Sequence, residues 1–446
     1  MDKLKLVNTF NDLLEGDEDL HRSSFEYLER EMAGSGVRFG KDIIPTFLRP
    51  YFITEAEGRL LKYSVNALMR CAEKLLELYE ADTEVAQYLE LSEGESELFA
   101  IPHGYDETAI ICRLDGFLIG KGLRFLEFNC DTPAGMGYGD RMASIFLSMP
   151  IFEKLKDDYR CHFIETRKRL LQVLLTCYRR FGGRDRPTIA MVGWEGLRTR
   201  PEFNLIKQTF EAKGYRTIIC DPRAMEYSRG HLTWKGTRVH LIYRKVLTSQ
   251  FLNRLDDLKD FLRAYREGAV CVVNPFGSKL LSYKSILYFL TDPRFADHFT
   301  TDEQRLLERF IPWTRRIADE RVLYRGREEE LISLIRKEKD RFVIKPSDAF
   351  GGHGVCIGSE TDEARWDEVI REALEGRWVV QEAIEIPEEN FPYFRPEGGV
   401  GRKKVNINPF AFGSRYAGSV ARISTSSVIN VSAGGGILPV IQAEEA

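Results

Sequence analysis

The chain has 446 residues, enough for two or three domains, and its 43% hydrophobic and 30% charged residues are ordinary for a globular protein. The formal net charge of −4 gives no basic field, which argues against non-specific binding of nucleic acid. No apolar run is as long as a membrane span, and the first residues lack the apolar core of a signal peptide. We therefore expect a cytoplasmic protein with no membrane and no nucleic-acid partner.

Residues 1–100 are predicted to form a helical N-terminal region. Between residues 55 and 91, apolar residues recur at intervals of three and four, and the segment contains no proline. The region holds no motif that indicates a chemistry.

Residues 101–184 are predicted to contain a β-hairpin, a loop and a helix. The runs TAIICRLDGFLI and LRFLEFN have the composition of strands and are joined by GKG, which is typical of a hairpin turn. The loop DTPAGMGYGD follows, and a helical stretch is expected from about 140 to 181.

The second half of the chain alternates strands and helices. Residues 185–275 read as strand, helix and strand in turn, which predicts a small βαβ domain. In residues 276–446 we expect a loop and a helix, then a charge-rich helical segment from 300 to 340. The strands RFVIKP and RWVVQEAIEIP follow, and the last part reads as strands with Gly/Ser-rich loops.

A glycine-rich stretch follows the strand RFVIKP. In VIKPSDAFGGHGV, Lys345 ends the strand, and Gly351, Gly352 and Gly354 permit positive φ and close approach of backbone N–H groups to a phosphate. It is not a Walker A motif, because no Lys-Ser or Lys-Thr follows, nor a Rossmann unit, because strand-like VCIG comes next. By itself the stretch is also typical of a hairpin turn with a solvated lysine.

Two other segments give this loop a context. The strand RWVVQEAIEIP, with Gln381, Glu382 and Ile384, suits an adenine hinge in which backbone groups pair with the base edge. Upstream, Lys284 opens the helix-like run KSILYFL and is a candidate for a second lysine at the site of the glycine-rich loop. Lys279, close to it in the sequence, is the alternative candidate. The alternative for Gln381 and Glu382 is the exposed end of a strand, and the alternative for Lys284 is a surface lysine.

The predicted hairpin carries a set of oxygen ligands. Glu127 and Asn129 stand two apart on one strand, so their side chains point to the same face, and Asp115 on the partner strand can reach that face. Carboxylate and amide oxygens suit Mg²⁺. The alternative is a surface hairpin with its polar residues outward. Arg113, which forms Arg-x-Asp with Asp115, and the Gly/Pro loop after Asn129 favour the metal site.

Together these motifs resemble the ATP-grasp superfamily, in which two lobes hold ATP under a glycine-rich β-hairpin. Because the metal residues precede the glycine-rich loop, their order resembles the circularly permuted ligases: the eukaryotic-type glutathione synthetase group and, more closely, glutathionylspermidine synthetase. The resemblance covers about residues 108–440. It implies an α/β (α+β) circularly permuted ATP-grasp fold, with residues 101–184 and 276–446 forming the core and residues 185–275 inserted as a small βαβ substrate-side domain.

The resemblance also implies the cofactors ATP and Mg²⁺ and a role for each motif residue. Arg113 is implied to be catalytic. The implied magnesium ligands are Asp115, Glu127 and Asn129. The implied ATP-binding residues are Lys284, Lys345, Gly351, Gly352, Gly354, Gln381, Glu382 and Ile384.

The sequence departs from the pattern of the glutathione synthetase group at two places. A metal-binding glutamate of the glycine-rich loop is replaced by Ala349, with Asp348 next to it. The Arg-x-Lys near the C-terminus is replaced by Arg422-Ile-Ser424, so a third ATP lysine is missing.

Arginines are the candidates for the substrate side, because phosphoryl transfer and tetrahedral intermediates need cations around the developing charge. Besides Arg113, we expect catalytic roles for Arg244 in LIYRKV and Arg422 in VARIST. The alternatives are a salt bridge at a strand end for Arg244 and a linker for the Ser/Gly-rich segment after Arg422.

These observations predict a ligase that joins a small-molecule carboxylate to an amine through an acyl phosphate, converting ATP to ADP and phosphate. A kinase or phosphotransferase on the same scaffold and a non-catalytic nucleotide-binding module are the rival hypotheses. A homodimer is an expectation from the family resemblance alone.

Overall fold

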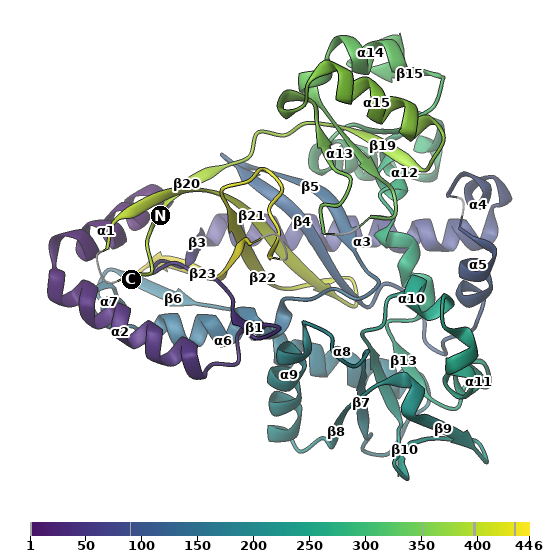
Figure 1. The fold of residues 1–446 in the computed structure, drawn as a ribbon, viewed down its shortest axis with the longest axis horizontal. Coiled ribbons are helices and arrows are strands. Elements are labelled where there is room, and N and C mark those ends of the chain that lie inside the picture. Colours follow the sequence, from purple (N-terminus) through teal and green to yellow (C-terminus); the bar gives the residue numbers. More distant parts are fainter. Residues whose placement is uncertain (1, 90, 350, 396–397, 432–433) are drawn as a thin grey trace.

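A large mixed sheet organises the protein (Figure 1). The computed structural model describes residues 2–446 apart from residues 90, 350, 396–397 and 432–433. This central sheet is eight-stranded, with the order β3-β23-β22-β21-β4-β5, while β20 pairs with β21 and β6 with β23. Its strands are β3 (Tyr51–Thr54), β4 (Ile111–Ile119), β5 (Gly122–Asn129), β6 (Tyr159–His162), β20 (Glu388–Pro392), β21 (Val400–Phe412), β22 (Arg415–Ser424) and β23 (Gly436–Glu445).

The central sheet lies between two layers of helices because its strands alternate apolar side chains toward both faces. Along β21, Phe410 and Phe412 join the core formed with α1 (Lys3–Gly16), α2 (Glu18–Gly34), α6 (Met136–Leu147), α7 (Pro150–Leu155) and α8 (Thr166–Arg180). Ala411, between them, joins the core around the long helix α3 (Glu55–Ala81). No helix within the described residues has both the length and the apolar character needed to cross a membrane.

The hairpin predicted over residues 108–129 is confirmed as β4 and β5, which pair antiparallel. Gly120 takes a φ of 56° in the turn, a left-handed conformation that favours glycine. The register places Arg113 opposite Asn129 and Asp115 opposite Glu127, and it shifts directly after Asp115. Such a bulge re-aims side chains locally, so the polar residues of both strands share one face.

The N-terminal region is helical as predicted, except over residues 38–54. The helices α1, α2 and α3 are followed in the sequence by the short helices α4 (Thr83–Leu89) and α5 (Glu93–Phe99). Between α2 and α3, the chain forms β1 (Arg38–Phe39), β2 (Asp42–Ile43) and β3, which pairs parallel to β23. The helical prediction is wrong here because Pro45 and Pro50 break the periodicity and the buried Tyr51-Phe52-Ile53 run supplies a strand.

The single helical stretch expected over residues 140–181 is also wrong in its middle. Helices α6 and α7 are separated from α8 by β6, which pairs with the end of β23. Since this pairing joins residues far apart in the sequence, no local pattern in residues 159–162 reveals it.

Residues 185–275 contain a parallel sheet in the order β13-β12-β7-β8, which we call the parallel sheet (Figure 1). Its strands are β7 (Ile189–Val192), β8 (Thr217–Cys220), β12 (Leu241–Arg244) and β13 (Cys271–Val273). Its helices are α9 (Arg200–Ala212), α10 (Thr248–Leu252) and α11 (Lys259–Arg266). A small antiparallel sheet of β9 (Met225–Ser228), β10 (His231–Trp234) and β11 (Thr237–Arg238) is inserted between β8 and β12.

A third sheet, which we call the lid sheet, has the order β14-β19-β17-β18. Its strands are β14 (Thr314–Arg316), β17 (Phe342–Pro346), β18 (Cys356–Ile357) and β19 (Trp378–Glu382), and its helices include α12 (Ser285–Thr291), α13 (Thr301–Phe310), α14 (Leu331–Lys337) and α15 (Glu363–Leu374). The helical prediction for residues 300–340 is wrong over 314–330, where β14 and the hairpin of β15 (Arg321–Tyr324) and β16 (Arg327–Glu330) occur. Arg325 and Gly326 take positive φ in that hairpin turn.

A buried ion pair fastens the N-terminal segment to the central sheet. The Arg49 side chain is wholly buried, and its guanidinium donates to the Glu389 carboxylate at 2.9 Å and to the Asn390 carbonyl at 3.0 Å. The Lys3 ammonium lies 3.1 Å from the same carboxylate. Glu389 therefore compensates the charge of two cations near β20.

We predict that Glu389→Ala lowers the free energy of unfolding by about 3 kcal/mol, because it leaves the buried Arg49 charge without a partner. Chemical denaturation of the full chain measures this change. Glu388→Ala is the matched control, since Glu388 on the same strand pairs with the exposed Arg402 and should change stability by about 1 kcal/mol or less. Equal losses in the two variants would contradict the prediction.

Candidate active site

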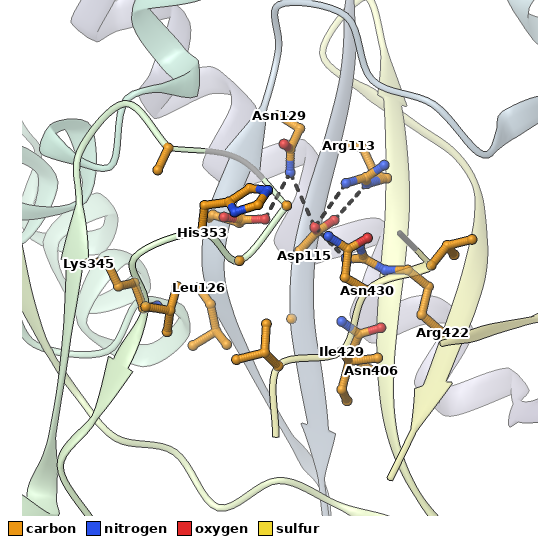
Figure 2. A pocket seen from close by; sticks show the side chains of 18 of the residues that line it. Arg113, Asp115, Leu126, Asn129, Lys345, His353, Asn406, Arg422, Ile429 and Asn430 are labelled. Carbon is orange, nitrogen blue, oxygen red and sulfur yellow. Dashed lines mark hydrogen bonds and ion pairs between the residues drawn. The ribbon is translucent and has the colours of Figure 1, made fainter. Parts of the chain in front are cut away.

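One cavity of about 760 Å³ is lined by residues of the central sheet and the lid sheet and by loops that follow strands of the parallel sheet. The β4–β5 hairpin and β21–β22 supply its polar floor, and the lid sheet and the loop after β17 cover it (Figure 2). The loops after β5, β7 and β12 and the segment around Phe39 close its other end.

Asp115 is the most heavily engaged carboxylate of the cavity (Figure 2). The Arg113 guanidinium donates to both of its oxygens, at 2.7 and 3.0 Å, and Arg422 from β22 donates at 2.5 Å. The Asn129 amide donates to it at 3.2 Å. Burial alone would raise the pKa of Asp115, but Arg113 and Arg422 outweigh it and hold that pKa well below its usual range. Asp115 is therefore a permanent anion that orients two arginines.

Glu127, Asn129 and Lys284 form the next part of the floor. The Asn129 amide nitrogen lies 3.4 Å from Glu127 Oε1, and the Lys284 ammonium lies 3.5 Å from Glu127 Oε2. Lys284 also donates to the Ala349 carbonyl oxygen at 2.6 Å. Lys284, one of the two predicted ATP-binding lysines, thus bridges the hairpin and the loop that follows β17, whereas the alternative candidate Lys279 is paired with Asp348.

Asp115, Glu127 and Asn129 carry oxygen ligands of the kind that Mg²⁺ prefers, and they lie together on one face of the hairpin, where the Asn129 amide nitrogen contacts both carboxylates. Glu127 is the freest of them, since Asp115 already accepts from two arginines. Among the described residues, no group of three or more His, Cys, Asp or Glu side chains is placed to hold a metal. A cation here would therefore depend on the amide of Asn129 and on ligand oxygens to complete its coordination.

Lys345 lies on β17 of the lid sheet, and its side chain lines the cavity on the side of that sheet. Its ammonium donates to Gln381 Oε1 at 2.7 Å, and Gln381 in turn donates to the Thr314 hydroxyl at 3.0 Å. Burial lowers the pKa of Lys345 to about 8, while the Glu127 carboxylate raises it and Lys284 lowers it further. Gln381 is buried and serves Lys345, so it does not lie at an exposed strand end.

The predicted adenine hinge follows β19. Glu382 and Ile384 line the cavity, and Glu382 accepts from the Tyr324 hydroxyl at 3.1 Å and from Arg325 at 2.5 Å. The Ala383 N–H donates to the Arg341 carbonyl at 2.7 Å. The hinge is thus held by the β15–β16 hairpin and by the residue before β17.

The glycine-rich loop has a backbone conformation that requires glycine at three positions. Gly351, Gly352 and Gly354 take φ values of 72°, 79° and 71°, a left-handed region that side chains rarely adopt. A Cβ on Gly352 would lie 2.3 Å from Val428 Cγ1, so the loop packs against the Ser/Gly-rich segment after β22. His353, between these glycines, also lines the cavity.

Of the predicted arginines, Arg113 and Arg422 line the cavity, and Arg244 is not among the described residues that do. The Arg244 side chain is wholly buried and donates to the Asp131 carboxylate at 2.7 Å and to the Asn274 carbonyl at 2.9 Å. These contacts join β12 to the loop after β5 and favour the salt-bridge alternative for Arg244. The catalytic role predicted for it remains untested by the geometry.

Two residues near the loop after β5, Lys245 and Glu202, were not predicted from the sequence. The Lys245 ammonium lines the cavity and donates to the Pro133 carbonyl oxygen, and Glu202 accepts from the N–H groups of Gly135 and Gly137 at 2.8 and 2.9 Å. Burial lowers the pKa of Lys245 to about 8, although Glu202 raises it. Lys245 stands directly after a predicted strand, which is the one signal in the sequence that could have drawn attention to it.

The sequence pattern of the circularly permuted ATP-grasp type 2 family matches residues 119–424. The chain belongs to this family, which confirms the expected permuted ATP-grasp fold. The glutathionylspermidine synthetase-like character of the sequence remains a prediction.

The matching relatives are uncharacterised proteins of Mycobacterium tuberculosis and Mycobacterium bovis, which are 25% identical over 345 residues. The match covers 70% of this chain and 56% of theirs, so it spans just over half of their length. Among solved structures, a glutathione synthetase-like effector from Globodera pallida superposes with a TM-score of 0.61 at 11% identity. That alignment covers 96% of this chain and 95% of the effector, and it shows a shared fold.

We predict that Asp115→Asn lowers the free energy of unfolding by about 3 kcal/mol, because the largely buried side chains of Arg113 and Arg422, which are 15% and 12% exposed, lose their counter-charge. Denaturant titration of the protein without added nucleotide measures the change. Glu127→Gln is the matched control from the partner strand: its side chain is 31% exposed, so we expect a loss of about 1 kcal/mol or less. A loss for Glu127→Gln as large as that for Asp115→Asn would contradict the prediction.

Proposed function

We propose that the protein is an ATP-dependent carboxylate–amine ligase that forms an amide bond through an acyl phosphate and releases ADP and phosphate. One observation carries the proposal. A single cavity brings the carboxylate and amide oxygens of the β4–β5 hairpin together with Lys284 and Lys345, which belong to segments far along the chain. Membership of the ATP-grasp family supports the same chemistry.

The nucleotide would lie between the hairpin and the lid sheet. Lys345 and Lys284 supply positive charge for the phosphates, and the glycine-rich loop presents backbone N–H groups to them. The segment from Gln381 to Ile384 would border the adenine. Mg²⁺, held by Glu127, Asn129 and Asp115, would neutralise phosphate charge and orient the phosphoryl group.

The arginines suit the transfer of the phosphoryl group. The carboxylate of the acid substrate attacks the γ-phosphorus, the bond to the β–γ bridging oxygen breaks, and ADP leaves. Arg422 is placed to stabilise the charge that develops, because its buried Nε–H has no hydrogen-bond partner among the described residues. Arg113, fixed by Asp115 and by the Ala134 carbonyl at 2.8 Å, lies beside it with little freedom to reorganise.

The second half-reaction requires a neutral amine. The amine nitrogen attacks the acyl carbon and gives up a proton, the bond from carbon to the phosphate oxygen breaks, and phosphate leaves with its electron pair and can take that proton. Coverage of the cavity by the glycine-rich loop and the Ser/Gly-rich segment would keep water from the acyl phosphate.

The test of this proposal is ADP release by the full chain in a screen of amino acids, γ-glutamyl peptides and polyamines, with mass spectrometry of the products. The expected result is ADP formation that needs both an acid and an amine, with an amide product. A phosphorylated acid that accumulates without an amine would instead support the kinase hypothesis. Nucleotide binding without turnover of any pair would support a non-catalytic module.

We predict that Lys345→Ala and Glu127→Ala each weaken binding of Mg-ATP by about 10- to 150-fold, the equivalent of a lost charge-assisted contact of 1.5–3 kcal/mol. Titration calorimetry measures both affinities. Lys337→Ala, at an exposed lysine of α14 in the same part of the chain, should bind as the wild type does. Wild-type affinity in the Lys345 and Glu127 variants would refute this assignment of the nucleotide site.

Nucleotide affinity should also depend on pH through Lys345. Its pKa of about 8 means that the free protein loses this positive charge as pH rises through 8, so binding of Mg-ADP should weaken above that pH, by up to about tenfold per unit. Phosphate ionisation, with a pKa of about 6, is complete in this range. Lys345→Arg stays charged and should give a flat profile between pH 7 and 9.5, whereas the same slope in both proteins would exclude Lys345 as the cause.

A further inference from the structure

The end of the cavity remote from the lid sheet has an apolar wall. Phe39, Ile44, Tyr138, Leu197 and Ile437 line the cavity and belong to, or pack against, one continuous hydrophobic core. The Tyr138 hydroxyl donates to the Arg38 carbonyl at 2.7 Å, which fixes the β1 turn against the start of α6. This wall is built from segments that contribute nothing to the nucleotide half, so we call this half of the cavity the substrate end.

The substrate end contains a buried cation with few partners. Lys245 is 5% exposed and lines the cavity. Among the described residues, one hydrogen-bond partner is found for its ammonium group, the carbonyl oxygen of Pro133. An ammonium group carries three donors, and a charge removed from water is costly unless it is paired. Lys245 is therefore placed to pair with an anion that enters the cavity.

No charged side chain among the described residues forms an ion pair with Lys245, so the pairing anion would come from a ligand. The Pro133 carbonyl bonded to Lys245 adjoins the Ala134 carbonyl bonded to Arg113, so both cations flank the same short loop. Glu202 is the carboxylate that most stabilises the charged form of Lys245, but no hydrogen bond or ion pair joins the two within the described residues, and Glu202 Oε1 accepts from the N–H groups of Gly135 and Gly137. Among the described residues, Glu202 is not part of the cavity lining.

The acidic residues of the cavity do not offer a place for a polycation at this end. Asp131, the carboxylate on the loop after β5, is 3% exposed and is bound by Arg244 at 2.7 Å and by the Thr248 N–H and hydroxyl at 2.9 and 2.8 Å. Asp115 is held by Arg113 and Arg422. The other carboxylates in the described lining belong to the hairpin floor, the lid loop or the hinge: Glu127, Asp348, Glu360, Glu382 and Glu385.

From this arrangement we infer that the substrate end binds a carboxylate-bearing molecule with an apolar body, and that Lys245 pairs with that carboxylate. A polyamine is not the nucleophile, because a polycation would meet Lys245, Arg113 and Arg422, and the freer carboxylate near them, Glu127, holds Mg²⁺ in the proposed function. An apolar amino acid has the required chemistry: its carboxylate faces Lys245, its side chain packs on the apolar wall, and its amine is left to react. This inference deepens the proposed ligase function and rests on it for the identity of the reacting groups.

The environment of Lys245 also favours the nucleophile that the reaction needs. Cations close to a bound amine lower its pKa, which increases the fraction of neutral amine able to attack. A bound carboxylate would raise the pKa of Lys245 and so offset the effect of burial on it. Ligand binding and protonation of Lys245 should therefore be linked.

The test compares an anionic ligand with a neutral ligand of nearly the same shape and with a polycation. In the presence of Mg-ADP, the full chain is titrated with 3-phenylpropanoate, with the neutral 3-phenylpropanamide and with spermidine. We expect the acid to bind at least about tenfold more tightly than the amide, the value of one charged hydrogen bond, and spermidine not to bind. Tighter binding of spermidine than of the acid, or equal binding of acid and amide, would overturn the inference without the need for any variant.

Variants then identify the lysine. Lys245→Met should reduce the ratio of acid to amide affinity to near one while leaving the affinity for Mg-ADP unchanged, since Lys245 lies outside the nucleotide half. Lys259→Met is the matched control, because Lys259 is an exposed lysine of the same region, with a 75% exposed side chain. Leu197→Asn should weaken acid and amide alike. A wild-type ratio in Lys245→Met would assign the carboxylate to Arg113 and Arg422 and overturn the role of Lys245.

Failure of this inference and failure of the proposed function give different results. If acid–amine pairs release ADP but the Lys245 variant discriminates as the wild type does, the ligase stands and the inference falls. If no pair releases ADP while the acid preference depends on Lys245, the ligase proposal falls and the binding assignment stands.

Discussion

The carboxylate of Asp115 is the point on which the rest of the site depends. It is held from both sides, by Arg113 of its own strand and by Arg422 from β22, while Asn129 of β5 donates to it from across the hairpin. These contacts tie the β4–β5 hairpin to the last strands of the chain at one place on the central sheet. Without this anion, two buried guanidinium groups would repel one another where the structure needs them side by side.

The cavity collects positive charge on side chains that are themselves buried, among them Lys345 and Lys245. Lys345 and Lys245 both titrate near pH 8 because burial disfavours their charged forms. Buried cations with incomplete pairing bind anions strongly, since the low local dielectric that penalises the free charge also strengthens a new ion pair. Phosphates at one end and a substrate carboxylate at the other would each relieve such a penalty.

The sequence predicted the elements that carry local signals. The hairpin of residues 111–129, with Asp115, Glu127 and Asn129 on one face, follows from strand alternation and a glycine turn, and the register confirms it. The glycine-rich loop after Lys345 is confirmed as a hairpin between β17 and β18. Strands β6 and β14 were not predicted, because each is stabilised by a partner strand remote in the chain and not by its own pattern.

By itself the sequence determined the order of the motifs and the residue types suited to phosphate and metal, since these depend on spacing and composition over short distances. The permuted ATP-grasp fold was expected from the resemblance that these motifs carry. The tertiary structure decided which lysines and arginines share a cavity. It separated Arg244, buried on Asp131, from Arg422, which lines the cavity, although both are arginines of buried strands. It also placed Lys245 beside an apolar wall drawn from residues 39, 44, 138, 197 and 437. No local pattern contains this information, because a side chain's neighbours across a cavity are set by how whole sheets and helices pack.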